Sequence, residues 1–170
     1  KSSPSQGLFF PTANTLQVSA YSDSDWASCP DDQRSTSGYC VLLGKNILSW
    51  SSKKQPTMSR SSTESEYKAI ANTAAELTWI QTLLRELDVI SPEPPILYCD
   101  NIGATYLASN PIYHARTKHI EIDYHFVRDM VATKLLDVCF ISGKDQLADI
   151  LTKSLAAARF NMLRSNLNVQ

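Results

Sequence analysis

The order of apolar and polar residues predicts a sheet that begins the fold and helices that follow it. Short apolar runs at 8–10 and 16–21, separated by turn residues, are typical of strands. The runs 38–43 and 46–50 flank the pair 44–45, which is the signal of a β-hairpin. Strands in such quick succession indicate an antiparallel meander.

A long amphipathic helix is predicted over about residues 62–88. Apolar residues recur there in steps of three and four, at Tyr67, Ile70, Ala74, Leu77, Ile80, Leu84 and Leu87. A proline-rich stretch at 91–95 ends this helix. The continuously apolar run 96–99 that follows is typical of a strand covered on both faces.

The rest of the chain alternates between helices and one more strand. We expect helices at 102–109, 120–132, 145–155 and 157–167, and a strand at 135–141. This order predicts an α/β fold, in which a mixed sheet is flanked by helices and has βαβ crossovers in its second half.

Length and composition fit one globular domain. The 170 residues are 43% hydrophobic, which is enough for a substantial core. The net charge of −1 carries no bulk signature of nucleic-acid binding and leaves room only for a local basic groove. No apolar run approaches the roughly 18 residues of a membrane span, and no signal-peptide pattern opens the chain. The start at Lys1 predicts a piece of a longer polypeptide.

The four cysteines are widely spaced and form no C-x-x-C pair. Cys40, Cys99 and Cys139 each fall inside an apolar, strand-like run, whereas Cys29 does not. This pattern favours buried free thiols over a disulfide framework or a zinc site, and with them a reducing intracellular setting.

Four acidic residues in four separate segments are candidate metal ligands: Asp23, Glu66, Asp100 and Asp149. A fold that brings scattered carboxylates together creates the oxygen-rich site that Mg²⁺ prefers. The chain therefore reads as a candidate metal-dependent enzyme that cleaves phosphodiesters.

Glu66 has the strongest support, because the neighbouring Glu64 acts as a control. Glu64 fits a capping box with Ser61, and its spacing to Lys68 is that of an ion pair on the solvent side of a helix. Glu66 instead shares the apolar face of the helix, where an ionised carboxylate is costly unless it is paired or binds a cation.

The other three acids keep a plain structural alternative. Asp23 and Asp25 point to the same face of an extended strand, so periodicity does not choose between them, and both could be turn formers. Asp100 ends a buried strand, where α/β sheets place ligands, but it could also cap the next helix. Asp149 precedes Lys153 by four residues, and a solvated helix face explains that spacing well.

Taken together, the order Asp, Glu, Asp, Asp across strand, helix, strand and helix resembles the ribonuclease H fold. The short sequence motifs around these acids resemble those of the ribonuclease H domain of copia-type (LTR) retrotransposon Pol polyproteins. The matching stretches are Tyr-Ser-Asp-Ser-Asp-Trp-Ala (21–27), Arg-Ser-Thr-Ser-Gly-Tyr (34–39), Ser-Trp-Ser-Ser-Lys-Lys-Gln (49–55), Ser-Ser-Thr-Glu-Ser-Glu-Tyr (61–67), Tyr-Cys-Asp-Asn (98–101), Arg-Thr-Lys-His-Ile (116–120) and Ala-Asp-Ile-Leu-Thr-Lys (148–153). The resemblance covers about residues 8 to 167.

The resemblance implies a five-stranded mixed sheet, with three antiparallel strands first and parallel strands after them. It implies that residues 14–156 form the ribonuclease H domain, that 1–13 are the tail of a preceding polymerase or connection region and the start of the first strand, and that 157–170 form a terminal helix. It also assigns the acidic tetrad to Asp23 rather than Asp25, with Glu66, Asp100 and Asp149, as both metal ligands and catalytic residues.

The implied activity is hydrolysis of the RNA strand of an RNA/DNA hybrid during reverse transcription. Two Mg²⁺ ions, with Mn²⁺ as a substitute, would lie about 4 Å apart and leave 5′-phosphate and 3′-hydroxyl ends. Asp23 would bridge them, with Glu66 and Asp100 on one ion and Asp149 on the other.

The implied partners are the hybrid and the reverse transcriptase domain of the same polyprotein, with no membrane and no small-molecule cofactor. The implied location is the cytoplasm, in a virus-like particle, or the nucleus.

Basic residues are candidates for holding the phosphate backbone of the hybrid: Lys53, Lys54, Arg60, Arg116, Lys118 and His119.

Many ribonucleases H have a histidine in the loop before the last acidic helix, and residues 142–146 contain none. We assign His114 and His125 to structural or surface roles, and Trp26 and Trp50 to the core or its rim.

Two rival functions remain open at this point. One is a catalytically silent or domesticated domain, a transposon remnant that binds hybrid without cutting it. The other is an integrase or transposase core, which uses the order Asp, Asp, Glu. The glutamate here comes second, at position 66, and this order favours ribonuclease H.

Overall fold

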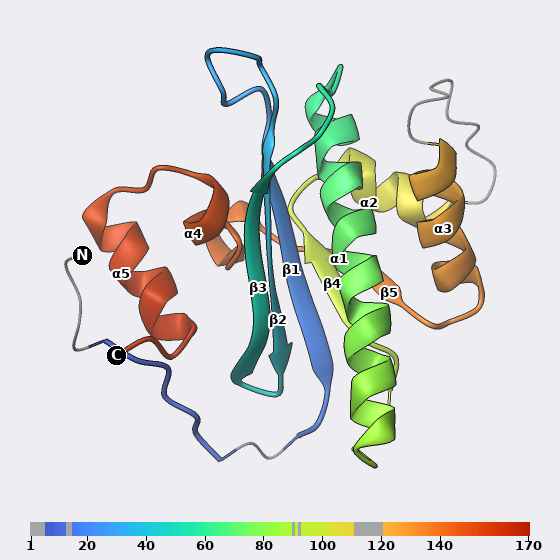
Figure 1. The fold of residues 1–170 in the computed structure, drawn as a ribbon, viewed down its shortest axis with the longest axis vertical. Helices are drawn as coiled ribbons and strands as arrows, with labels where there is room; N and C mark the ends of the chain where they lie inside the picture. Colours follow the sequence, from blue (N-terminus) through green and yellow to red (C-terminus); the bar gives the residue numbers. More distant parts are fainter. Residues whose placement is uncertain (1–5, 13–14, 90, 92, 111–120) are drawn as a thin grey trace.

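The amino-terminal strands pair as the predicted meander and form one side of a five-stranded sheet, from its edge to its central strand. The computed structural model describes residues 6–12, 15–89, 91, 93–110 and 121–170. The sheet has the order β3-β2-β1-β4-β5, in which β2 pairs antiparallel with β1 and β3, and β4 pairs parallel with β1 and β5 (Figure 1). Its strands are β1 (Val18–Asp25), β2 (Thr36–Leu43), β3 (Asn46–Lys54), β4 (Ile96–Cys99) and β5 (Asp137–Phe140). The predicted fold class is confirmed.

Helices cover both faces of the sheet. On one side lie α1 (Ser62–Glu86), α2 (Ile102–Ser109) and α3 (Glu121–Ala132), and on the other lie α4 (Asp149–Thr152) and α5 (Ala157–Asn166) (Figure 1). Because successive strand residues point to opposite faces, β2 contributes to two cores. Val41 packs in the core beneath α1, whereas Cys40 and Leu42 pack in the core beneath α5.

Two predicted elements differ from the observed ones. The run 8–10 forms no strand of its own, and only Leu8 makes an isolated bridge, to Val169. The helix predicted over 145–155 is replaced by a 3-10 turn, η2 (Gly143–Asp145), and the four-residue α4. The side chain of Gln146 accepts a hydrogen bond from the backbone N–H of Ala148, so local side-chain bonding competes with a continuous helix there.

All four cysteines are free thiols, as predicted. Cys40 and Cys99 are buried, whereas Cys29 and Cys139 are half-buried. Burial raises the pKa of Cys40 to about 12, so this thiol is neutral at ordinary pH. Among the described residues, no helix combines the length and the hydrophobicity that a membrane span requires.

Candidate metal centre

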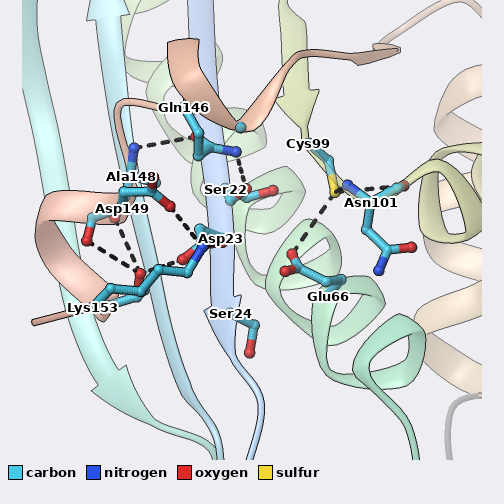
Figure 2. A network of polar contacts seen from close by, with 12 residues as sticks. Ser22, Asp23, Ser24, Glu66, Cys99, Asn101, Gln146, Ala148, Asp149 and Lys153 are labelled. Atoms are coloured by element: carbon cyan, nitrogen blue, oxygen red, sulfur yellow. Dashed lines mark hydrogen bonds and ion pairs between the residues drawn. The ribbon is translucent and has the colours of Figure 1, made fainter. Parts of the chain in front are cut away.

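Four separate elements bring the four predicted carboxylates to one end of the sheet. Asp23 lies near the end of β1, Asp100 directly follows β4, Glu66 lies in the first turns of α1, and Asp149 begins α4. Strands β1 and β4 are parallel, with Ser22 paired to Cys99, so the two aspartates that come next lie side by side. Figure 2 shows Asp23 and Asp149 on one side of this site and Glu66 on the other.

The carboxylates fall into two groups that share Asp100. Ligand atoms of Asp23, Asp100 and Asp149 lie within 4.8 Å of one another, and so do those of Glu66, Cys99 and Asp100. Asp23 is fully buried, and Glu66 and Asp149 are nearly so. Asp25 is half-buried and belongs to neither group, although it lies only two residues beyond Asp23.

The electrostatics of the site show a shortage of positive charge. Burial, together with the charges of Asp23 and Asp100, raises the pKa of Glu66 to about 9. Burial and the charge of Asp23 also raise the pKa of Asp100. Buried carboxylates of this kind are stabilised by a hard cation, which prefers oxygen ligands. Cys99 is a poor ligand for such a cation, because Mg²⁺ prefers oxygen ligands to sulfur, and burial also raises the pKa of its thiol.

The direction of Glu66 is fixed by how α1 begins. Ser61 caps the helix and its side chain accepts a hydrogen bond from the backbone N–H of Glu64, 3.1 Å away, as the capping pattern predicted. The carboxylate of Glu64 does not complete the box at Ser61, and instead accepts from the backbone N–H of Arg60 at 3.0 Å. The first turn is therefore tied to the residues just before the helix.

The expected solvent-side position of Glu64 and Lys68 is wrong. The ion pair forms, with 2.9 Å between Lys68 Nζ and Glu64 Oε1, but both side chains are buried. Lys68 also donates to the hydroxyl groups of Thr57 and Ser59, each 3.1 Å away. The pair is enclosed because the segment between β3 and α1 folds over it, and helical spacing alone does not reveal such a cover.

The solvated helix face, which was the structural alternative to a ligand role for Asp149, is not what the structure has. Its carboxylate is bound by Lys153, with 2.7 Å between Nζ and Oδ1, but Asp149 is buried. Lys153 Nζ also lies 3.0 Å from Oδ1 of Asp23 (Figure 2). Spacing along α4 therefore predicted the pair correctly and missed that it faces the other carboxylates.

Three residues that position α4 were not among the predicted site residues. Gln146 is fully buried and donates from Nε2 to the carbonyl of Ser22, 2.9 Å away. Gly38 makes room for α4, because a Cβ there would lie 2.7 Å from Thr152 Cγ2. Arg159 of α5 donates to the carboxylate of Asp149 at 3.2 Å. A glycine inside a strand is a recognised sign of close approach, whereas nothing in the sequence marks the other two.

The loop that lacks the family histidine lies against the site. A Cβ at Gly143 would be 3.3 Å from Oδ2 of Asp100, so this loop packs close to that carboxylate. Arg159 holds the loop by donating to the carbonyls of Gly143, at 2.8 Å, and Lys144. A guanidinium thus fixes a loop that contains no titrating imidazole.

The predicted phosphate contacts are only partly described. Lys53, Lys54 and Arg60 are exposed, near the end of β3 and the start of α1, and Lys54 pairs with Asp32 at 3.3 Å. Arg116, Lys118 and His119 lie outside the described residues, as does His114. Trp26 and Trp50 lie at the rim rather than in the core, with exposed fractions of 47% and 55%.

Comparison with known proteins identifies the family to which the chain belongs. It is 52% identical over 166 residues to the retrovirus-related Pol polyprotein from transposon RE1 of Arabidopsis thaliana, and 37% identical over 147 residues to that from transposon TNT 1-94 of Nicotiana tabacum. These matches cover 98% and 86% of the chain and 11% of each relative. The chain belongs to the copia-type Pol polyproteins. It spans about a tenth of the length of the Pol polyproteins it matches.

Solved structures show the same fold for this Pol segment. LC11-RNase H1, solved in complex with an RNA/DNA hybrid, superposes with a TM-score of 0.58 over 80% of the chain and 94% of that structure, at 14% identity. The amino-terminal ribonuclease H domain of a Mycobacterium tuberculosis protein gives 0.59 over 89% and 98%, at 9% identity. The segment therefore has the ribonuclease H fold. No protein-family model matches it.

Proposed function

We propose that this Pol segment is a ribonuclease that hydrolyses the RNA strand of RNA/DNA hybrids. The observation that carries the proposal is the convergence of Asp23, Glu66, Asp100 and Asp149, which come from four separate elements. Asp23, Glu66 and Asp149 are buried, and burial of several carboxylates together is costly unless a cation balances their charge. The fold and the Pol relatives support the same activity.

The donor set fits a hard divalent cation. When bound at these carboxylates, Mg²⁺ would supply an activated water and charge stabilisation at the leaving oxygen. Asp23 and Asp149 present oxygens on one side and Glu66 on the other, with Asp100 close to both. Asp100 is the carboxylate that both groups share, and the bridging role that the family resemblance implies for Asp23 stays a prediction.

The protein's own groups orient the carboxylates of this site. Gln146 and Gly38 seat α4 against the sheet, so Asp149 faces Asp23 instead of solvent. Asp23 is fully buried, and a hydrogen bond from the hydroxyl of Thr152 to Oδ2 orients its carboxylate. Exposed Lys53, Lys54 and Arg60 would hold the sugar–phosphate backbone, and the 2′-hydroxyl groups would mark the RNA strand.

The remaining parts of the proposal are the partner, the location and the alternative metal ion that the family resemblance implies. A reverse transcriptase domain of the same Pol polyprotein would be the partner that supplies the hybrid. We propose the cytoplasm, in a virus-like particle, or the nucleus as its location. Mn²⁺ would replace Mg²⁺, because it accepts the same oxygen ligands.

A cleavage assay on a labelled RNA/DNA hybrid tests the proposal. We expect the wild-type chain to shorten the RNA strand when Mg²⁺ is added and to leave 5′-phosphate ends. Asp100→Asn keeps the shape of the side chain and removes its charge, so it should fold normally and lose cleavage by at least about 100-fold. Asp145→Asn changes an exposed carboxylate in the adjacent turn and should cleave normally.

Two outcomes contradict the proposal in different ways. Full cleavage by Asp100→Asn would show that these carboxylates are not the reactive centre. Hybrid binding by the wild-type chain without any cleavage, in Mg²⁺ or Mn²⁺, would identify a silent hybrid-binding domain instead.

A further inference from the structure

The ammonium group of Lys153 lies between two carboxylates of the proposed metal centre. Its Nζ is 2.7 Å from Oδ1 of Asp149 and 3.0 Å from Oδ1 of Asp23 (Figure 2). Lys153 directly follows α4 and its side chain is 36% exposed, whereas that of Asp23 is fully buried. The positive charge therefore reaches the buried carboxylates from the solvent side.

Each of these carboxylates has a second oxygen that is held by a different group. Oδ2 of Asp23 accepts a hydrogen bond from the hydroxyl of Thr152. Oδ2 of Asp149 accepts from Arg159, whose guanidinium is itself fixed by the carbonyl of Gly143. The orientation of both carboxylates is thus maintained without Lys153, and the two oxygens that remain both face its ammonium.

Those same two oxygens are what a metal ion would use. An ammonium group has only donors and no lone pair, so it cannot share the coordination of a cation and competes with it for Oδ1 of both residues. Lysine has a long, flexible stem that can turn to solvent, unlike the fixed guanidinium of Arg159. Lys153 is therefore the exchangeable contact among those that these carboxylates make.

We propose that Lys153 is a tethered cation that occupies the centre while no metal is bound, and that it must leave Asp23 and Asp149 for a metal to bind. In the metal-free protein it offsets the repulsion between the buried carboxylates. On metal binding it sets the concentration of free divalent ion at which the site fills. This role rests on the proposed function, because that function places the metal at these carboxylates.

The test measures metal binding without nucleic acid. Calorimetric titration with Mn²⁺, and then Mg²⁺, compares the wild-type chain with Lys153→Met, which keeps the length of the side chain and removes its charge. We expect the variant to bind the ion about tenfold more tightly, the scale of one charged hydrogen bond. In EDTA it should unfold at a lower temperature, because Asp23 then loses its ion pair with Lys153 and Asp149 keeps only Arg159. Lys153→Arg should restore stability in EDTA and weaken metal binding again.

Control variants separate this role from the metal site itself. Lys144→Met removes a charge from an exposed side chain in the neighbouring turn and should bind metal as the wild type does. Asp100→Asn should lose metal affinity. If Lys153→Met binds metal no more tightly than the wild type, while Asp100→Asn still weakens binding, the tethered-cation role is wrong and the metal centre stands. If none of the chains binds Mn²⁺ or Mg²⁺, both are wrong.

Discussion

Gly38 lies directly opposite Asp23 in the antiparallel pair of β1 and β2. A Cβ at this position would be 2.7 Å from Thr152 Cγ2 and 2.8 Å from Leu151 Cβ, so the missing side chain is the space into which α4 packs. We expect Gly38→Ala to push α4 away from the sheet and to move Asp149 relative to Asp23. Overpacking of this kind costs about 1–3 kcal/mol, and misplaced ligands should weaken metal binding as well. Urea unfolding and a Mn²⁺ titration measure the two effects.

Gly7 offers a matched control for that substitution. A Cβ added there meets no atom within 4 Å. Gly7→Ala should therefore not lower the free energy of unfolding, and it should leave the affinity for metal unchanged. Equal behaviour of the two alanine variants would show that Gly38 does not position α4.

Asp23 and Asp25 give a direct comparison within one strand. Only Asp23 lies with Asp100 and Asp149, although both residues share a face of β1 and differ by two positions. Asp23→Asn should abolish hybrid cleavage and weaken Mn²⁺ binding, whereas Asp25→Asn should keep both within about twofold of the wild type. Single-turnover cleavage at saturating protein separates a loss of chemistry from a loss of hybrid binding. A strong loss in Asp25→Asn alone would reverse the assignment.

The sequence predicted this site unevenly, and the reasons are physical. Glu66 was recognisable because the spacing of apolar residues places it on the apolar face of the helix. An ionised carboxylate on that face is costly unless it is paired or binds a cation. Asp149 carried no such signal, because its burial depends on Gly38 in β2 and on Gln146, which join α4 to distant strands. Contacts between segments more than 100 residues apart have no periodicity to reveal them.

The same limit explains what was misjudged about two lysines. Lys68 and Lys153 each follow an acid by four residues, and both predicted ion pairs form. Spacing specifies the pair but not the surroundings of the pair. One is enclosed by the segment before α1, and the other faces the carboxylate of Asp23. The five strands, by contrast, follow from short apolar runs and turn residues that lie close together in the sequence, although the run 8–10 was wrongly predicted as a sixth.

The raised pKa of Glu66 predicts how stability depends on pH when no metal is present. The folded protein keeps this carboxyl protonated up to about pH 9, whereas the unfolded chain releases the proton near 4.5. Its contribution to stability is therefore complete below pH 4.5 and is lost as the pH rises toward 9, with a slope of at most about 1.4 kcal/mol per pH unit. Asp100, whose pKa is also raised, acts in the same direction.

Unfolding in EDTA at several pH values between 5 and 9 measures this slope. Glu66→Gln mimics the neutral carboxyl, so the variant should gain stability relative to the wild type as the pH rises. Glu86→Gln, at the exposed end of α1, should run parallel to the wild type. A constant difference between Glu66→Gln and the wild type across this range would exclude a protonated Glu66.

The buried pair of Glu64 and Lys68 should stabilise the start of α1 as a unit. Burial raises the pKa of Glu64, but hydrogen bonds from Lys68 and from the Arg60 backbone outweigh that effect and lower it overall, which favours the ionised carboxylate. Lys68→Met leaves a buried carboxylate without its partner and should cost about 3–5 kcal/mol, and Glu64→Gln should also be strongly destabilising. The double variant Glu64→Gln/Lys68→Met should cost clearly less than the two single changes added together, since neither charge is then stranded.

Denaturant unfolding of the four chains at pH 7 completes this cycle. Because Glu66 lies in the same turns of α1, each single variant should also weaken Mn²⁺ binding, and the double variant should recover part of the loss. Glu86→Gln again serves as the control for removing one negative charge from α1. Additive free energies in the cycle would mean that the two side chains stabilise α1 independently, and that the segment over Lys68, rather than the ion pair, holds Glu66 toward Asp100.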